Sequence, residues 1–447
     1  MAVDATASSP STPWYRLLDR SQWNTLLASN LGWLFDGYEV YAVILTLGVA
    51  LHQLLDPSLL PQLRSYFGFI IATTLLGWGF GGLIGGVLAD YIGRKRTMTL
   101  AILAYSLMTG LSAFAWSWTS FAVLRFLVGI AIGSEWATGA SITAELWPDQ
   151  ARGRGAGLMQ CGLGMGFFTA SLVWVFVGSH GPDAWRYMFL IGVIPGLFTL
   201  WIRRGIPESA VWEKTHQQRQ AAVERKRSGR PLEADHALTR FTVHELFADP
   251  KVRLRLLIVF LMSLATTLAW WGISSWVPLY IGGVAKNAGL AETTWQAYAG
   301  MAYNVGAIIG YIGLGFFADV YGRKPITLLF FALALLMTPV LFLWTSGLGL
   351  LLLAAGVNGL FTLGQYSWMP VWLPELFPTR VRATAAAFAF NTPRFVAFLG
   401  PLFAPALIGY FGGLGHAAVT ISLIYVVGFL ATLALPETRG KPLPENI

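Results

Sequence analysis

The chain contains the stretch GVLADYIGRKR at residues 86–96, and it carries a second copy, GFFADVYGRK, at residues 315–324. In both copies an aspartate stands four residues before an arginine, and a glycine directly precedes that arginine. Two further pairs of landmarks recur: AELWP at 144–148 with PELFP at 374–378, and PES at 207–209 with PET at 436–438. All three pairs are 229 or 230 residues apart. This constant spacing indicates a duplication, so we predict two structurally related halves.

The composition indicates a polytopic helical membrane protein. Of the 447 residues, 55% are hydrophobic and only 12% are charged, and apolar stretches of about 20 residues recur along the chain. The net charge of +8 does not indicate nucleic-acid binding, because the basic residues cluster in short segments between the apolar stretches. The single cysteine, Cys161, excludes an intramolecular disulfide and a thiolate metal site.

Twelve apolar stretches are long enough to cross a bilayer, so the predicted fold is an all-α membrane protein with two pseudo-symmetric bundles of six helices. The first six predicted spans are Trp23–Leu51, Phe69–Ile92, Met98–Trp116, Phe121–Trp147, Gly153–Val177 and Trp185–Ile202. The second six are Leu254–Ile281, Trp295–Val320, Ile326–Trp344, Leu348–Glu375, Ala383–Phe411 and Ala417–Leu435.

The distribution of Lys and Arg predicts the orientation in the membrane. With the N-terminus inside, 25 of the 30 basic residues fall on the inner side, three fall outside and two lie within spans. This asymmetry predicts a multi-pass protein of the cell membrane with both termini in the cytoplasm. The predicted segments are a tail, a first bundle, a cytoplasmic linker with an interfacial helix at 210–227, a second bundle and a second tail, at residues 1–22, 23–205, 206–252, 253–436 and 437–447.

The duplicated stretch resembles the loop after the second helix that marks the major facilitator superfamily. The sequence RFLVG at residues 125–129 agrees with this resemblance, which covers essentially the whole chain. Two duplicated six-helix halves place a substrate at their interface near the bilayer midplane. The resemblance also implies that the halves alternately open the site to each side of the membrane.

Several motifs resemble different branches of this superfamily. PES after the sixth span and PETRG after the twelfth resemble sugar porters, but LATTLAWWG at residues 264–272 lacks the Gln-Leu-Ser element of that branch. DGYE at residues 36–39 is similar to the D-G-aromatic-D element of aromatic-acid/proton symporters. GSEW at residues 133–136 and WRYM at residues 185–188 look more like metabolite/proton symporters for organic acids. The choice between these branches stays open.

Three carboxylates lie inside predicted spans. Asp36 and Glu39 share one face of the first span, and Glu135 lies midway along the fourth. Because a charge at this depth costs roughly 2.5–3.5 kcal/mol on insertion scales, such residues usually serve a function. All six histidines fall in loops or at span ends. We therefore predict that Asp36, Glu39 and Glu135 bind the coupling proton; a permanent ion pair with a buried arginine is the alternative.

The duplication distinguishes the roles of the two halves. Glu135 corresponds to the neutral Gln365 in the second half, and Asp36 corresponds to a position near Ala265. The central acids are therefore confined to the first half. We interpret this as a division in which the first half couples protons and the second half supplies more of the substrate contacts.

Two arginines lie inside predicted spans. Arg394 follows Pro393 about twelve residues into the eleventh span, where a guanidinium could hold a substrate carboxylate by two hydrogen bonds. The alternative for Arg394 is a fixed salt bridge to Asp36 or Glu39. Arg125 lies nearer the outer end of the fourth span, so it could extend to the lipid headgroups in a structural role.

Further residues are candidates for lining the substrate site. Gln365 and Asn391 are the neutral polar side chains expected to orient the substrate. Aromatic side chains could surround it, although aromatic residues in membrane helices more often serve packing or interfacial belts. The aromatic candidates are Tyr38, Trp270, Trp271, Tyr303, Tyr366 and Trp368.

The duplicated stretches are predicted to form a cytoplasmic gate. By resemblance, Asp90 with Arg94 and Asp319 with Arg323 hold the cytoplasmic side closed while the outside is open. We expect Glu145 with Arg152, and Glu375 with Arg382, to complete this gate. Breaking these contacts would then be the alternating-access switch.

The best hypothesis from the sequence is a proton-coupled importer of a small organic anion, either a monocarboxylate or an aromatic acid. The alternatives are a carrier of an osmolyte or cation, a drug exporter, and a nutrient sensor that does not transport. No catalytic or metal-binding motif is present, so we predict neither an enzyme nor a cofactor. The expected partners are the lipid bilayer, the substrate and protons, without nucleic acid, and the expected state is a monomer.

Overall fold

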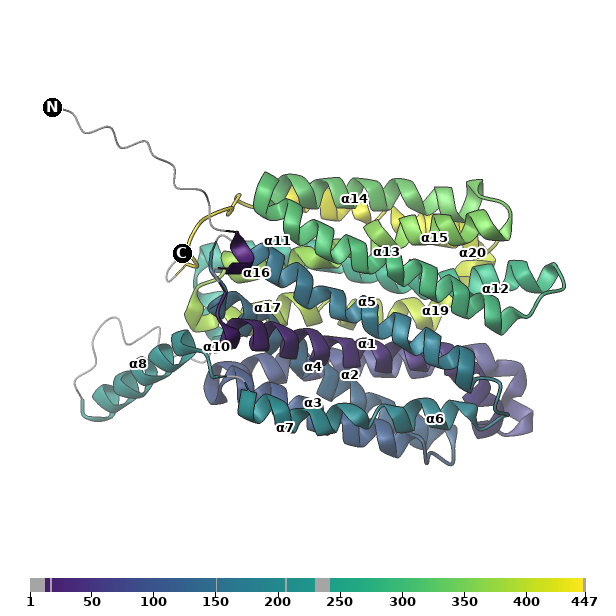
Figure 1. The fold of residues 1–447 in the computed structure, drawn as a ribbon, viewed down its shortest axis with the longest axis horizontal. Coiled ribbons are helices and arrows are strands. Elements are labelled where there is room, and N and C mark those ends of the chain that lie inside the picture. Colours follow the sequence, from purple (N-terminus) through teal and green to yellow (C-terminus); the bar gives the residue numbers. More distant parts are fainter. Residues whose placement is uncertain (1–12, 17, 150, 206, 230–241, 445–447) are drawn as a thin grey trace.

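Every regular element in the described part of the chain is a helix. The computed structural model describes residues 13–16, 18–149, 151–205, 207–229 and 242–444. The long helices run side by side along the longest dimension of the molecule (Figure 1). This confirms the predicted all-helical class, whereas the predicted tails and linker lie partly outside the described residues and their boundaries stay predictions.

The first half and the helix that follows it contain eight labelled α-helices: α1 (Arg20–Leu54), α2 (Leu63–Ile92), α3 (Arg94–Ser112), α4 (Trp118–Leu146), α5 (Arg152–Val177), α6 (Ala184–Ile191), α7 (Ile194–Gly205) and α8 (Ala210–Arg227). The second half contains α10 (Thr242–Ala248), α11 (Pro250–Ala269), α12 (Val277–Asn287), α13 (Glu292–Tyr321), α14 (Arg323–Pro339), α15 (Leu348–Thr362), α16 (Trp368–Leu376), α17 (Arg382–Asn391), α18 (Arg394–Ala397), α19 (Leu399–Tyr410), α20 (Leu414–Ser422) and α21 (Tyr425–Ala434). The predicted helix at 210–227 is confirmed as α8.

Ten stretches of the described residues are long and apolar enough to cross a membrane, whereas the sequence predicts twelve spans. The two remaining predicted spans correspond to α3, which begins with three basic residues, and to α6 with α7, which are separated after Ile191. Both segments lie alongside the long helices (Figure 1). The count of twelve therefore stays a prediction.

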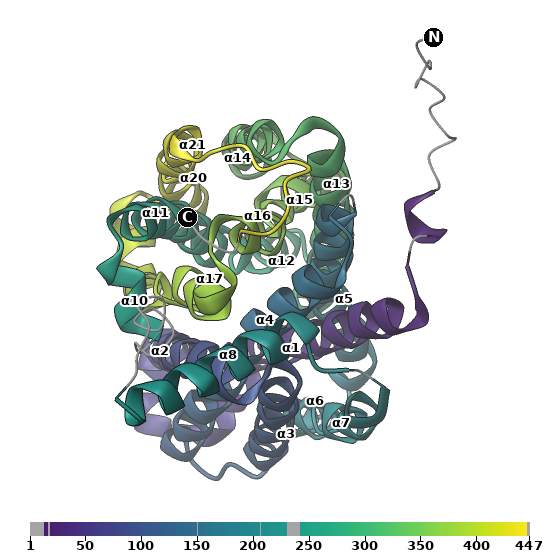
Figure 2. The same cartoon turned by 90° about the vertical axis from the view of Figure 1, so that its left-hand side faces the viewer.

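Figure 2 shows the helices as two groups, seen from the end of the molecule at which α8 lies. Helices α1 to α7 form one group, and α11 to α21 form the other. The two groups meet where α2 packs against α17 and where α5 packs against α13. At Gly157 of α5, an added Cβ would lie only 2.8 Å from the carbonyl oxygen of Tyr311 in α13, so this close approach requires glycine.

The duplicated stretches form the turns between α2 and α3 and between α13 and α14. Gly93 and Gly322 adopt φ angles of 104° and 110°, which other residues rarely adopt, and this explains the glycine that precedes each arginine. Both turns lie at the end of the molecule where α8 begins (Figure 2). We call this end, defined by Asp90, Arg94, Asp319 and Arg323, the charged end.

Two helices of the second half are interrupted near their middle. Helix α11 continues into one turn of π-helix, Trp270–Ser274, and Pro278 follows at the start of α12. Helix α17 ends at Asn391, and Pro393 separates it from Arg394 in α18. Proline lacks the N–H that continues a helix, and single π-turns often occur at functional sites.

Candidate functional site

Two buried carboxylates from neighbouring helices lie against each other. Asp36 of α1 is 0% exposed and Glu135 of α4 is 1% exposed. The Glu135 carboxylate passes directly over Gly32, one turn before Asp36, where a Cβ would overlap it. The two carboxyl groups lie near enough to form a hydrogen bond if one of them holds a proton. In the described part of the chain, neither oxygen of Asp36 has a hydrogen-bond partner, so a proton held between the pair would satisfy both groups.

Glu39 is held differently, because it forms an ion pair with Arg125 of α4. Arg125 also donates a hydrogen bond to the Ser112 hydroxyl, and its guanidinium lies 4.7 Å from the ring centre of Phe189. Arg125 is 0% exposed. The expectation that Arg125 extends to lipid headgroups is therefore wrong, because the carboxylate on the facing helix gives its charge a closer partner.

We expect Arg125→Ala to lower the free energy of unfolding by about 3–5 kcal/mol, because it leaves the Glu39 charge buried without its partner. Thermal and denaturant unfolding of the purified protein in detergent measures this loss. The double variant Glu39→Gln with Arg125→Met should recover most of the stability, since no buried charge remains. Arg64→Ala, which removes an exposed arginine, is the control and should change stability by less than about 1 kcal/mol. Equal stability of Arg125→Ala and the wild type would contradict a stabilising pair.

Arg394 is buried without an acidic partner. It is 1% exposed, and no carboxylate of the described residues lies within ion-pair distance of it. Its guanidinium lies 4.3 Å from the ring centre of Trp78 in α2 and 4.2 Å from that of Phe390 in α17. One guanidinium nitrogen donates to the carbonyl oxygen of Phe390, whereas Nε has no acceptor. The predicted alternative, a salt bridge from Arg394 to Asp36 or Glu39, is absent from the described contacts.

Four aromatic side chains connect the two halves beside these charges. Trp136 of α4 stacks on Phe390 of α17 with ring centres 3.7 Å apart, and Trp33 lies 6.0 Å from Phe390 and 6.2 Å from Trp78. We call Trp33, Trp78, Trp136 and Phe390 the aromatic cluster. No sequence pattern predicted this cluster, although Trp136 directly follows Glu135 and Trp33 precedes Asp36 by one turn.

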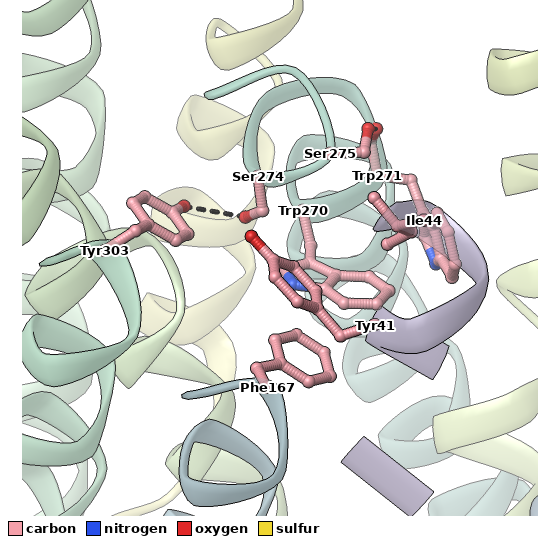
Figure 3. Close-up of a pocket in the computed structure, with 8 residues that line it drawn as sticks. All are labelled: Tyr41, Ile44, Phe167, Trp270, Trp271, Ser274, Ser275 and Tyr303. Atoms are coloured by element: carbon pink, nitrogen blue, oxygen red, sulfur yellow. Dashed lines mark hydrogen bonds between the residues drawn. The ribbon is translucent and has the colours of Figure 1, made fainter. Parts of the chain in front are cut away.

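A small cavity lies between the halves, and Figure 3 shows the eight side chains that line it. The predicted residues Trp270, Trp271 and Tyr303 meet there, with Tyr41 and Phe167 from the first half. The Tyr303 hydroxyl lies 2.7 Å from the Ser274 hydroxyl. Its free volume of about 10 Å³ is near the minimum that can hold one water molecule, so this cavity has no space for a larger substrate in this conformation.

Tyr366 lies between this cavity and the aromatic cluster. Its ring centre is 6.0 Å from that of Trp270 and 6.2 Å from that of Phe390, and its hydroxyl donates to Thr267 over 3.2 Å. The neighbouring Gln365 accepts a hydrogen bond from Thr266 at 3.5 Å. Both are buried in the short 3-10 segment Gly364–Ser367.

The remaining predicted site residues lie in different surroundings. Asn391 packs against Gly82 of α2 and donates to the carbonyl oxygen of Ala387, but its own side-chain oxygen has no donor among the described residues. Trp368 donates to Thr266. The Tyr38 hydroxyl donates to the carbonyl oxygen of Met188 within the first half, so Tyr38 is not brought to the other candidates.

Two ion-pair networks connect the halves at the charged end. Arg94 contacts Asp90 at 3.0 Å and Glu145 at 3.1 Å, and Glu145 also contacts Arg382 of the second half at 3.3 Å. In the duplicate network, Arg323 contacts Asp319 at 2.9 Å and Glu375 at 2.7 Å, and Glu375 also contacts Arg152 of the first half at 3.4 Å. The expected pairing of these glutamates and arginines within each half is therefore wrong. The partners are exchanged because α17 packs against α4 and α5 packs against α16.

Asp90 and Asp319 each also accept hydrogen bonds from the opposite half. Asp90 accepts from the backbone N–H of Thr384 at 3.0 Å and from the Thr384 hydroxyl. Asp319 accepts from the backbone N–H groups of Gly153 and Arg154 at 3.1 and 3.0 Å. These donors lie in the first turns of α17 and α5, where the helix dipole favours a negative charge. The charged end is therefore closed in this conformation.

The repeated PES and PET sequences support these networks. Glu437 accepts hydrogen bonds from the backbone N–H groups of Arg323 and Lys324, both at 3.0 Å, as Glu208 does from those of Arg94 and Lys95. Burial would raise the pKa of Glu437, but the backbone N–H groups around it hold the pKa below its usual value. This carboxylate therefore stays charged near neutral pH.

The segment after α21 also reaches the ion-pair networks of the charged end. Arg152 donates to the carbonyl oxygen of Lys441 at 3.5 Å, and Arg382 donates to that of Pro444 at 3.3 Å. Figure 2 shows this segment crossing the charged end in yellow. One arginine from each half thus binds the same C-terminal segment, residues 441–444. The sequence did not predict this contact.

The sequence and the fold of this chain are similar to those of known membrane transporters. Residues 25–446 match the family described as "Sugar (and other) transporter". The sialic acid transporter NanX of Escherichia coli (strain K12) is 27% identical over 94% of this chain and 96% of its own length. The cis,cis-muconate transport protein of Acinetobacter baylyi is 28% identical over 84% of this chain and 86% of its own length. The solved structure of the proton:xylose symporter XylE with 6-bromo-6-deoxy-D-glucose aligns with a TM-score of 0.72 at 22% identity, over 95% of this chain and 98% of that chain, and shares the fold.

Proposed function

Because the chain belongs to the sugar (and other) transporter family of the major facilitator superfamily, whose members are membrane transporters and not enzymes, we propose that it carries a small organic acid together with protons. The proposed substrate is a monocarboxylate or aromatic acid. The proposed direction is import by alternating access between the two halves.

The observation that carries this proposal is the uncompensated charge of Arg394. An isolated buried cation is costly, so its retention at a contact between halves favours an anionic ligand that completes the pair. The two aromatic faces beside its guanidinium favour a flat acid over a bulky one. The names of two relatives, a sialic acid transporter and a cis,cis-muconate transport protein, support a carboxylic acid as the substrate class.

Asp36 and Glu135 are the proposed proton site. They have no cationic partner among the described residues, whereas Glu39 is already paired with Arg125. A proton on the acid pair would remove an unpaired charge inside the first half, and a carboxylate on Arg394 would remove one where the second half contacts the first. Binding of both would then favour the conformational change that an incompletely loaded carrier resists. Glu39 is proposed to act through Arg125, by holding α1 and α4 together.

The charged end is the proposed cytoplasmic gate. The Lys and Arg count supports this assignment, because 25 of the 30 basic residues belong to this end by the predicted topology. Opening it requires the crossed contacts of Glu145, Glu375, Asp90 and Asp319 to break. The hydrogen bonds from Arg152 and Arg382 to the segment at residues 441–444 must also break.

We expect Glu145→Gln to open the charged end, because it leaves Arg382 without its acid and removes the negative charge that lies between the like charges of Arg94 and Arg382. Amide hydrogen exchange in the first turn of α17, where Asp90 holds the N–H of Thr384, should become at least about fivefold faster. Glu213→Gln, which neutralises an exposed acid on α8, is the control and should leave this exchange unchanged. Unchanged exchange in Glu145→Gln would contradict the gate.

The experiment that tests the proposed function is uptake into proteoliposomes with an imposed pH gradient. The solutes are a panel of monocarboxylates and aromatic acids, neutral sugars and quaternary amines. Acid uptake accompanied by alkalinisation of the outer medium would support the proposal. Uptake of amines or sugars without acid uptake would overturn it and favour the alternative carriers.

A further inference from the structure

The second half has a solvent-accessible hollow on its side, near the charged end. It is formed where α10, α11 and α17 meet, and its volume is about 520 Å³. Phe247 and Phe388 both line it, and their rings pack edge-on with centres 5.6 Å apart. Leu254 and Leu257 are 59% and 55% exposed along its wall. The hollow is therefore an open apolar groove on a surface that faces lipid in a membrane protein.

One cationic side chain without a partner among the described residues lines this groove, and a second lies in the same helical turn. Arg253 lines it, and Lys251 precedes Arg253 in the first turn of α11. Both are exposed, and neither side chain has a hydrogen bond or ion pair with a described residue. The neighbouring acids are already engaged, because Asp249 caps α11 through the N–H of Lys251 and Glu245 pairs with Arg380 at 3.2 Å. The free positive charge is therefore available to a ligand.

We propose that this groove binds one anionic phospholipid, with an acyl chain along Phe247, Leu254, Leu257 and Phe388 and the phosphate on Arg253. The apolar wall of the groove matches an acyl chain, and the arginine beside it matches an anionic headgroup. Basic pockets between helices are known to bind anionic headgroups in membrane proteins. A flat lipid-facing helix surface would offer the apolar contact but no enclosed site. Neither Arg253 nor this groove takes part in the proposed transport site or gate.

The site also borders a contact between the halves. Phe388 lies on α17, one turn after Thr384, which bonds Asp90 of the first half. A lipid in the groove would therefore contact the same helix that closes the charged end. Lipid binding is nevertheless a separate property and can be tested without a transport measurement.

The test is titration of the full-length purified protein with dioleoylphosphatidylglycerol and, separately, dioleoylphosphatidylcholine, followed by native mass spectrometry. The wild type should bind one molecule of the anionic lipid more tightly than the zwitterionic lipid. Arg253→Ala should weaken binding of the anionic lipid about fivefold, since one basic residue contributes about 1 kcal/mol. Arg96→Ala, which removes an exposed arginine at the same end but outside the groove, should leave it unchanged.

A second variant separates the groove from general charge attraction. Leu257→Trp should fill the groove from an exposed position and weaken binding of the anionic lipid while the unfolding temperature stays unchanged. The proposal is overturned if phosphatidylcholine binds as tightly as phosphatidylglycerol. It is also overturned if Arg96→Ala weakens binding as much as Arg253→Ala, or if Leu257→Trp binds the anionic lipid as the wild type does.

Discussion

Arg394→Ala is expected to reduce uptake of the organic acid, measured as kcat/KM in proteoliposomes, by at least about 30-fold. Loss of one partner of a buried, hydrogen-bonded charge pair costs about 2–5 kcal/mol, and 2 kcal/mol corresponds to this factor. Arg394→Lys should retain part of the activity, because it keeps the charge but loses the fork that can hold both carboxylate oxygens. Arg64→Ala, which removes an exposed arginine outside the duplicated stretches, is the control and should transport as the wild type does.

A binding measurement separates a substrate contact from a structural role. The acid should raise the unfolding temperature of the wild type and not that of Arg394→Ala, because a ligand stabilises only the protein that binds it. Without substrate, the variant should lose only the stability that comes from packing on Trp78 and Phe390, since Arg394 has no acidic partner to leave unpaired among the described residues. Wild-type uptake and ligand stabilisation in Arg394→Ala would refute the proposed carboxylate site.

Glu135→Gln and Asp36→Asn are expected to abolish concentrative uptake, so that the accumulation ratio under a pH gradient falls to about one. Exchange of substrate across the membrane at equal concentrations should continue, because the neutral side chains preserve shape while removing the site that gains and loses a proton. The measurement compares pH-driven uptake with counterflow in the same proteoliposomes. Asp56→Asn, which changes an exposed acid, is the control and should leave both activities intact.

Glu39→Gln should behave differently from these two variants. It leaves Arg125 without its carboxylate, so a loss of stability should accompany any loss of transport. Glu135→Gln and Asp36→Asn remove uncompensated acids and should not destabilise the protein. If Asp36→Asn and Glu135→Gln both retain concentrative uptake, the proposed coupling site is wrong.

The sequence by itself predicted the all-helical class, the duplication and the position of the costly charges. These properties are local or periodic: an apolar stretch of bilayer length reads as a helix, and a glycine before Arg94 or Arg323 marks a turn with positive φ. It also identified Trp270, Trp271 and Tyr303, which do meet at one cavity. The spans that differ, at α3 and at α6 with α7, are those whose basic or interrupted sequences weaken the apolar pattern.

Which charge meets which partner was decided only by the tertiary structure. Glu145 and Glu375 exchange arginines between the halves, and Arg125 turns inward to Glu39, because helices distant in the chain bring these groups closer than their neighbours in sequence. For the same reason, Arg394 packs against the rings of Trp78 and Phe390 and not against a carboxylate. A buried charge is stabilised by whatever lies within a few ångströms, and that distance depends on packing between helices, which no spacing along one helix specifies.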